Sequence, residues 1–152
     1  MTTTILNTIK ANISSSNSKY KDSIYSDWNK TSIQNKGKVG EAVAETILVD
    51  NGHLVGARVS TEHDRMVDGK KVEIKTLFQA EQLDTYKFYG FNPTDDAHYW
   101  LLVFVTPKDE VVLVKMDREA AAKMYTWESK KSQVIEGKLS EFIEAGEVMY
   151  AV

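Results

Sequence analysis

The chain has 152 residues, the size of one domain with a substantial core, and it contains no cysteine, which excludes disulfides, thiolate metal sites and cysteine nucleophiles. No apolar run approaches the roughly 20 residues that cross a membrane, and the first residues lack the basic start and unbroken apolar core of a secretory signal. We therefore expect a cytoplasmic protein with no membrane partner.

The net charge of −3 is unevenly distributed along the chain. Residues 1–38 carry six Lys and two Asp, a local charge of +4 that leaves −7 for the remainder. An acidic chain is poorly suited to coating nucleic acid without specificity, because such binding depends on neutralising phosphates. The segregation predicts a lysine-rich N-terminal helix and arm over residues 1–35 and a catalytic domain over residues 36–152, together one globular unit. The arm either contacts DNA or is a solvated tail.

The N-terminal segment has two predicted parts. Apolar residues at helical spacing predict a short helix within residues 1–16. The stretch from residue 14 to residue 38 is rich in Ser, Asn and Lys and predicts a loosely ordered arm. Its aromatic side chains would stack on bases, pack on a partner subunit or dock the arm on the domain.

A helix is predicted from residue 36 to residue 50, ended by an Asn-Gly pair. At its start, Gly37 and Gly40 could leave backbone N–H groups free to hold a phosphate, which makes Lys36 and Lys38 candidate nucleic-acid contacts. The Walker pattern is absent, so no nucleotide triphosphatase is implied. The apolar pattern predicts that the helix faces the core with Val39, Ala42, Val43, Thr46 and Ile47.

The segment from residue 63 to residue 79 predicts a hairpin, because an Asp68-Gly69 pair separates two apolar-polar runs. If these two residues form the loop, Asp64 lies opposite Glu73, and side-chain alternation places Lys75 on the same face. Directly opposed residues hold their Cβ atoms about 4.5–5.5 Å apart, so two carboxylates can bind one divalent cation. The other face is predicted to be core, with Val67, Val72 and Ile74.

These residues resemble the signature of the PD-(D/E)xK nuclease superfamily, an acidic residue on one strand followed by Glu-x-Lys on the next, here Asp64 and Glu73-Ile74-Lys75. The resemblance covers about residues 38–104 and includes the preceding Gly40-Glu41 pair. His63 stands where the eponymous proline would be. The resemblance implies a restriction-endonuclease-like fold and hydrolysis of DNA with Mg²⁺, for which Mn²⁺ would substitute.

The resemblance also implies roles for individual residues. Asp64, Glu73 and the Ile74 backbone carbonyl would be metal ligands, and Lys75 would orient water or stabilise charge. Glu41 would assist the metal site, with a solvated side chain as the alternative. If the strand continues, Gln79 shares the face of Lys75 and would contact phosphate or water, with a structural hydrogen bond as the alternative.

The remaining pattern predicts a mixed sheet flanked by helices, in an α/β fold. Further strands are expected over residues 54–59, 99–105 and 111–115, and a last one over residues 147–152. Helices are expected from Asp117 to about residue 131 and around residues 139–146. The three histidines have no metal-like spacing, and we expect structural or surface roles for them.

The functional prediction is a Mg²⁺-dependent endodeoxyribonuclease of the restriction type, and a structure-specific enzyme such as a Holliday junction resolvase is the alternative within that class. Either would act as a homodimer, because cutting two strands with one site per chain needs two chains. Two rivals of other classes stay open. One is a non-catalytic nucleic-acid-binding module, and the other is a structural protein in which Glu73 and Lys75 are only a surface ion pair.

Overall fold

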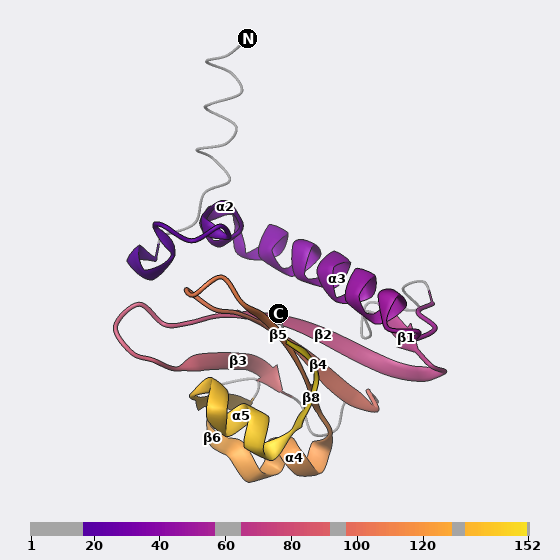
Figure 1. Ribbon diagram of the computed structural model, residues 1–152. Coiled ribbons are helices and arrows are strands. Elements are labelled where there is room, and N and C mark those ends of the chain that lie inside the picture. Colours follow the sequence, from indigo (N-terminus) through magenta and orange to yellow (C-terminus); the bar gives the residue numbers. More distant parts are fainter. Residues whose placement is uncertain (1–16, 57–64, 92–96, 129–132, 152) are drawn as a thin grey trace.

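The computed structural model describes residues 17–56, 65–91, 97–128 and 133–151, to which every structural statement below refers (Figure 1). The first part of the chain contains η1 (Ser18–Tyr20), α2 (Ser26–Lys30), α3 (Ile33–Asp50), β1 (Arg65–Val67), β2 (Lys70–Phe78) and β3 (Tyr86–Phe91). The second part contains β4 (Tyr99–Val105), β5 (Val111–Met116), α4 (Arg118–Met124), β6 (Tyr125–Glu128), β7 (Gln133–Gly137), α5 (Leu139–Ala145) and β8 (Glu147–Ala151). None of these helices is both long and apolar enough to cross a membrane.

A five-stranded mixed sheet with the order β1-β2-β4-β5-β8 is the centre of the structure. β2 and β4 are parallel, and all other neighbours are antiparallel. The connection between the parallel strands contains β3, which joins a second sheet of order β3-β7-β6. Helix α3 covers one face of the large sheet, whereas α4, α5 and the second sheet lie on the other side (Figure 1). The predicted α/β fold with a mixed sheet flanked by helices is confirmed.

The central strand β4 is buried along its whole length, because both faces of the sheet are covered. Its side chains alternate between two apolar clusters. The α3 side contains Ala44, Leu48, Val67, Val72, Ile74, Tyr99, Leu101, Val103, Val111 and Leu113. The opposite side contains Leu77, Trp100, Leu102, Phe104, Val112, Val114 and Met116 from the large sheet, with side chains from β3, β7, α4 and α5.

The β1–β2 hairpin has the predicted register. Val67 is paired with Lys70, and Asp68 and Gly69 have φ values of 50° and 79°, as a two-residue turn with both central residues at positive φ requires. The Asp68 carboxylate accepts a hydrogen bond from the Leu54 N–H (2.9 Å) and contacts His53 Nδ1 (2.7 Å). The His53 hydrogen bond lowers the pKa of Asp68. These contacts tie the turn to the segment that follows α3.

Helix α3 begins earlier than predicted and presents a different face to the sheet. Ser32 caps it by accepting from the Asn35 N–H, and the buried residues are Gly40, Ala44 and Leu48. Val43 and Ile47 pack beside them as predicted, but Val39, Ala42 and Thr46 point outward, so that part of the prediction was wrong. The physical reason is close approach, because a Cβ on Gly40 would lie only 1.7 Å from Thr76 Oγ1 on β2. The helix contacts the sheet at Gly40, which has no side chain.

The early start of α3 also removes the expected phosphate cradle. Gly37 and Gly40 lie inside the helix, past its first turn, rather than in a loop before it. The N–H groups of such residues bond to carbonyls four residues earlier and are not available to an anion. The expectation of a Gly37–Gly40 loop that holds phosphate was therefore wrong.

Residues 17–35 are ordered against the body rather than loose, so the prediction of a loosely ordered arm was wrong for them. The Tyr20 hydroxyl donates to the Val105 carbonyl and accepts from the Gln79 N–H (2.8 Å), and Tyr20 is 1% exposed. Trp28 packs edge-on against Phe78. The aromatic side chains dock the segment on the domain, and the predicted boundary at residue 35 falls inside α3. The helix expected within residues 1–16 lies outside the described residues.

The C-terminal half follows the prediction except between α4 and α5, where β6 and β7 are two strands that were not predicted. Asp117 caps α4 through the Ala120 N–H (2.8 Å), α5 ends before Gly146, and β8 adds a strand beside β5. However, α4 stops at Met124, and residues 125–128 form a strand paired with β7 instead of more helix. Residues 125–128 are of types that also form strands, and their pairing with β7 outweighs the helical pattern. Of the strand expected at residues 54–59, the structure describes only a single bridge from Val55 to Val67.

We expect stability to fall steeply in alkaline solution. Burial raises the pKa of Tyr86 and Tyr99 to about 12, and it also raises the pKa of Tyr20. These phenols ionise near pH 10 in the unfolded chain, so above that pH the folded protein binds more protons. The free energy of unfolding should fall between about pH 10 and pH 12 by up to about 1.4 kcal/mol per pH unit for each tyrosine.

Urea unfolding at a series of pH values measures this loss. Tyr20→Phe is the informative variant, because it removes one of the three phenols together with the hydrogen bonds to Val105 and Gln79. It should be less stable at neutral pH and lose less stability in alkali. An unfolding free energy that stays flat to pH 12 would contradict the burial of these hydroxyl groups.

Candidate functional site

Glu73 lies in β2 beside Trp100 of β4, with which it is in register. Its Oε2 accepts a hydrogen bond from Trp100 Nε1 (3.2 Å), and its Oε1 lies 2.9 Å from Lys75 Nζ. The Glu73 side chain is 15% exposed and that of Lys75 is 35% exposed. Trp100 is completely buried, so a carboxylate and an ammonium group are positioned on a rigid apolar support.

The two faces of β2 are less different than predicted. Val67, Val72 and Ile74 are buried against α3, which confirms the predicted core face. The opposite face is charged at Glu73 and Lys75 but becomes core at Leu77, which is 3% exposed. The second sheet and its neighbours cover that half of the strand. The charged pair therefore lies at the margin of a core rather than on an open charged face.

Asp64, the predicted second acidic ligand, lies outside the described residues. The described ladder runs up to the pair Arg65 and Val72. If the ladder continues by one residue, the next pair is Asp64 and Glu73. The proximity of these two carboxylates remains a prediction from register.

Glu41 is placed beside Arg65 rather than beside Glu73. Its Oε2 lies 3.5 Å from Arg65 Nη1, and Glu45 Oε2 lies 3.5 Å from Arg65 Nε. Because Arg65 is in register with Val72, it shares the α3 side of the hairpin, whereas Glu73 is on the other side. Arg65 was not among the residues predicted to contact Glu41. The sequence did contain a signal for such a contact, because two glutamates one helical turn apart can both pair with one basic side chain.

Gln79 lies outside the group formed by Glu73 and Lys75. It follows the end of β2, four residues beyond Lys75, or about 13 Å along an extended chain. Its Oε1 accepts a hydrogen bond from Lys19 Nζ (3.0 Å), and its carbonyl accepts from Asn17 Nδ2 (2.6 Å). The alternative of a structural hydrogen bond is therefore confirmed, and Gln79 anchors the N-terminal segment.

The two candidate nucleic-acid lysines are also distant from Glu73. Lys36 Nζ lies 5.2 Å from the centroid of the Phe78 ring, at the far end of β2, and burial lowers its pKa. Lys38 is exposed on α3. Both lysines lie on the α3 side of the sheet, whereas Glu73 and Lys75 are on the other side.

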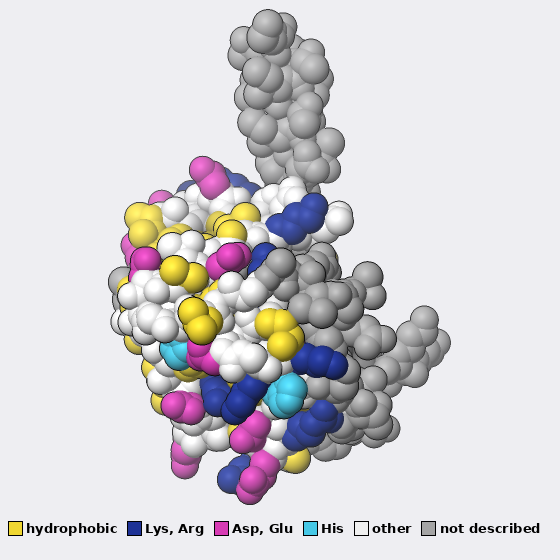
Figure 2. Space-filling model, turned by 90° about the vertical axis from the view of Figure 1, so that its right-hand side faces the viewer, with side chains coloured by type: hydrophobic (Ala, Val, Ile, Leu, Met, Phe, Trp, Pro, Cys, Tyr) yellow, Lys and Arg dark blue, Asp and Glu magenta, His cyan; other side chains and the backbone are white. Residues whose placement is uncertain are grey.

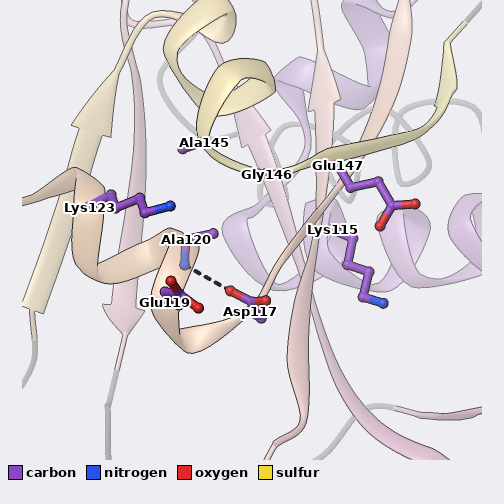
Figure 3. Close-up of a pocket in the computed structure, with 8 residues that line it drawn as sticks. All are labelled: Lys115, Asp117, Glu119, Ala120, Lys123, Ala145, Gly146 and Glu147. Atoms are coloured by element: carbon purple, nitrogen blue, oxygen red, sulfur yellow. Dashed lines mark hydrogen bonds between the residues drawn. The ribbon is translucent and has the colours of Figure 1, made fainter.

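A surface pocket of about 260 Å³ lies elsewhere, between the end of β5, α4 and the α5–β8 junction (Figure 3). Two lysines and three acidic residues line it, and the Asp117 carboxylate caps α4. It contains none of the predicted site residues. The lining residues are Lys115, Asp117, Glu119, Ala120, Lys123, Ala145, Gly146 and Glu147.

Glu73 contributes one described carboxylate to the predicted metal site, and its oxygens contact the Trp100 N–H and the Lys75 ammonium. Carboxylate and backbone carbonyl oxygens are the ligands that Mg²⁺ prefers, and a lysine nearby can balance charge when the cation is absent. No group of three or more His, Asp or Glu side chains able to hold a metal lies within the described ranges, from which Asp64 is missing.

Comparison with known proteins adds no family assignment. No model of a protein family matches the chain, and no curated protein sequence matches it.

Proposed function

We propose that this protein is a Mg²⁺-dependent endodeoxyribonuclease with a restriction-endonuclease-like core. The observation that carries the proposal is the hairpin turn at Asp68 and Gly69, whose described register runs to the pair Arg65 and Val72. If the ladder continues by one residue, this register predicts Asp64 opposite Glu73. The 2.9 Å contact between Lys75 and Glu73 supports it, because an acid and a base are brought together on the strand that the nuclease signature requires.

In this proposal Asp64, Glu73 and the Ile74 carbonyl hold the cation. When bound, Mg²⁺ would lower the pKa of a coordinated water and neutralise charge on the phosphate, and Mn²⁺ would replace it. Lys75 would orient the attacking water or stabilise the developing negative charge. Glu41 has an accessory role at most, through Arg65, which follows Asp64 in the sequence.

Trp100 gives Glu73 a defined orientation. Its indole N–H donates to Oε2 at 3.2 Å, and the ring packs edge-on against Phe91. A metal ligand whose rotamer is set by a buried neighbour binds with less loss of entropy than a free surface carboxylate. This preorganisation favours the catalytic interpretation of Glu73 and Lys75 over a simple surface ion pair.

The substrate in this proposal is duplex DNA, and the protein acts as a homodimer. With one site per chain, two copies related by a two-fold axis are needed to cut both strands. A restriction-type enzyme and a Holliday junction resolvase share this arrangement, and cleavage of linear duplex compared with four-way junction DNA separates them.

We expect plasmid DNA to be nicked or linearised when the protein is incubated with Mg²⁺ or Mn²⁺, and to stay intact with EDTA, because the ion supplies the activated water. Gel analysis of the plasmid forms measures this. A metal-independent gel shift without cleavage would favour the non-catalytic binding module. If the protein neither binds nor cuts DNA, the result would favour a structural protein in which Glu73 and Lys75 are only an ion pair.

A further inference from the structure

A group of basic side chains lies beside Glu73 on the same side of the large sheet. Lys71 is two residues before Glu73 on β2, and side-chain alternation puts both on one face. His98 bonds to Lys71, and Arg118 lies over the ring of Trp100, with its Cζ 5.7 Å from the ring centroid. On the face that carries the β1–β2 end of the sheet, Lys and Arg side chains gather around a histidine (Figure 2).

His98 makes two hydrogen bonds to the backbone of Lys71, one of them through its ring. Its backbone N–H donates to the Lys71 carbonyl (2.8 Å), and its Nδ1 accepts from the Lys71 N–H (2.9 Å). Because a backbone N–H can only donate, the neutral ring carries its proton on Nε2. That N–H is on the side of the ring away from the sheet backbone, and His98 is an exposed residue. The arrangement presents a preorganised hydrogen-bond donor.

Arg118 completes the group next to His98. Its Nη2 donates to the carbonyl of Ala97 (3.0 Å), the residue before His98, while the guanidinium covers the Trp100 ring. The same Trp100 holds Glu73, so the cation and the carboxylate contact one indole. The positions of Arg118 and Glu73 are thus linked through a buried side chain.

We propose that His98, with Lys71 and Arg118, binds a backbone phosphate of the DNA strand that enters the site of Glu73 and Lys75. An imidazole N–H, an ammonium and a guanidinium are all donors to phosphate oxygens. His98 lies two residues before Trp100, or about 7 Å along the strand from the level of Glu73. Since one DNA strand advances about 3.4 Å along the axis per nucleotide, the phosphate is within about two nucleotides of the cut bond.

This inference deepens the proposed function and rests on it. His98, Lys71 and Arg118 are positioning residues, because they hold the substrate beside the reacting phosphate and do not touch the bond that is cut. Their effect should appear in DNA affinity and KM and leave kcat nearly unchanged.

The test compares His98→Asn with the wild-type protein. Asparagine places an oxygen near the position of Nδ1, so it still accepts from the Lys71 N–H, but it lacks the outward Nε2–H. Binding of a labelled DNA duplex is followed by fluorescence anisotropy at several salt concentrations in EDTA, which prevents cleavage. We expect about tenfold weaker binding, because a hydrogen bond to a charged group is lost. His53→Asn, which changes the other described histidine, should bind like the wild type.

Lys71→Ala provides an independent measurement. Losing one phosphate contact should lower the slope of log affinity against log salt by about 0.9, whereas a purely structural effect would leave the slope unchanged. Lys108→Ala, at the exposed β4–β5 turn, controls for charge alone. Wild-type affinity and slope in both His98→Asn and Lys71→Ala would overturn this inference, even if the protein cuts DNA. A wild-type protein that binds no DNA would overturn the inference and the nuclease function together.

Discussion

Glu73→Gln should abolish metal-dependent DNA cleavage and leave the fold intact. Glutamine keeps an oxygen that accepts from Trp100 Nε1, so the buried indole N–H stays satisfied, but it removes the negative charge that binds the cation. We expect a loss of more than about a hundredfold in the cleavage rate, since even residues that only orient a metal ligand cost about 10- to 100-fold. Plasmid cleavage with Mg²⁺ and thermal unfolding measure the two properties separately.

The alanine variant distinguishes the structural role of Glu73 from its catalytic one. Glu73→Ala also removes the hydrogen-bond acceptor of the buried Trp100 N–H, which costs about 1–3 kcal/mol of stability. Glu144→Gln, which changes an exposed acid on α5, should cut and unfold like the wild type. A folded Glu73→Gln protein that cuts at the parental rate would show that Glu73 is not a metal ligand.

Gly40→Ala should be the most destabilising single-methyl substitution in α3. The added Cβ would lie 1.7 Å from Thr76 Oγ1 and 2.9 Å from Thr76 Cβ, so rotating the threonine does not relieve the contact. The helix must move away from β2, and overpacking of this kind costs about 1–3 kcal/mol or more. Thermal unfolding measures the loss, at about 2–4 °C in Tm per kcal/mol for a domain of this size.

Gly37→Ala is the matched control on the same helix. No atom lies within 4 Å of its added Cβ, so alanine should stabilise the helix by about 0.5–1 kcal/mol. Adding Thr76→Ala to Gly40→Ala should recover part of the loss, because it removes Oγ1 and Cγ2 from the contact, giving a non-additive double-mutant cycle. Equal stability of the Gly40→Ala and Gly37→Ala proteins would contradict the close packing of α3 on β2.

Local chemistry explains which parts of the structure were predictable. The Asp68-Gly69 turn was predictable, because few residue pairs accept positive φ at two successive positions. A two-residue loop then sets the register of both strands. The apolar strand over residues 99–105 was also predictable, since a continuous β-branched and aromatic run is typical of a strand buried on both faces. These are properties of neighbouring residues.

The sequence by itself determined the α/β class, the hairpin and the shared face of Glu73 and Lys75. The tertiary structure alone decided which face of α3 is buried. The helix packs on β2 at Gly40 because Thr76 leaves no room for a side chain, and helical periodicity does not contain this information. It likewise decided that Gln79 anchors residues 17–20 and that Trp100 orients Glu73. These contacts join residues tens of positions apart, and their geometry follows from how strands and helices pack rather than from spacing along the chain.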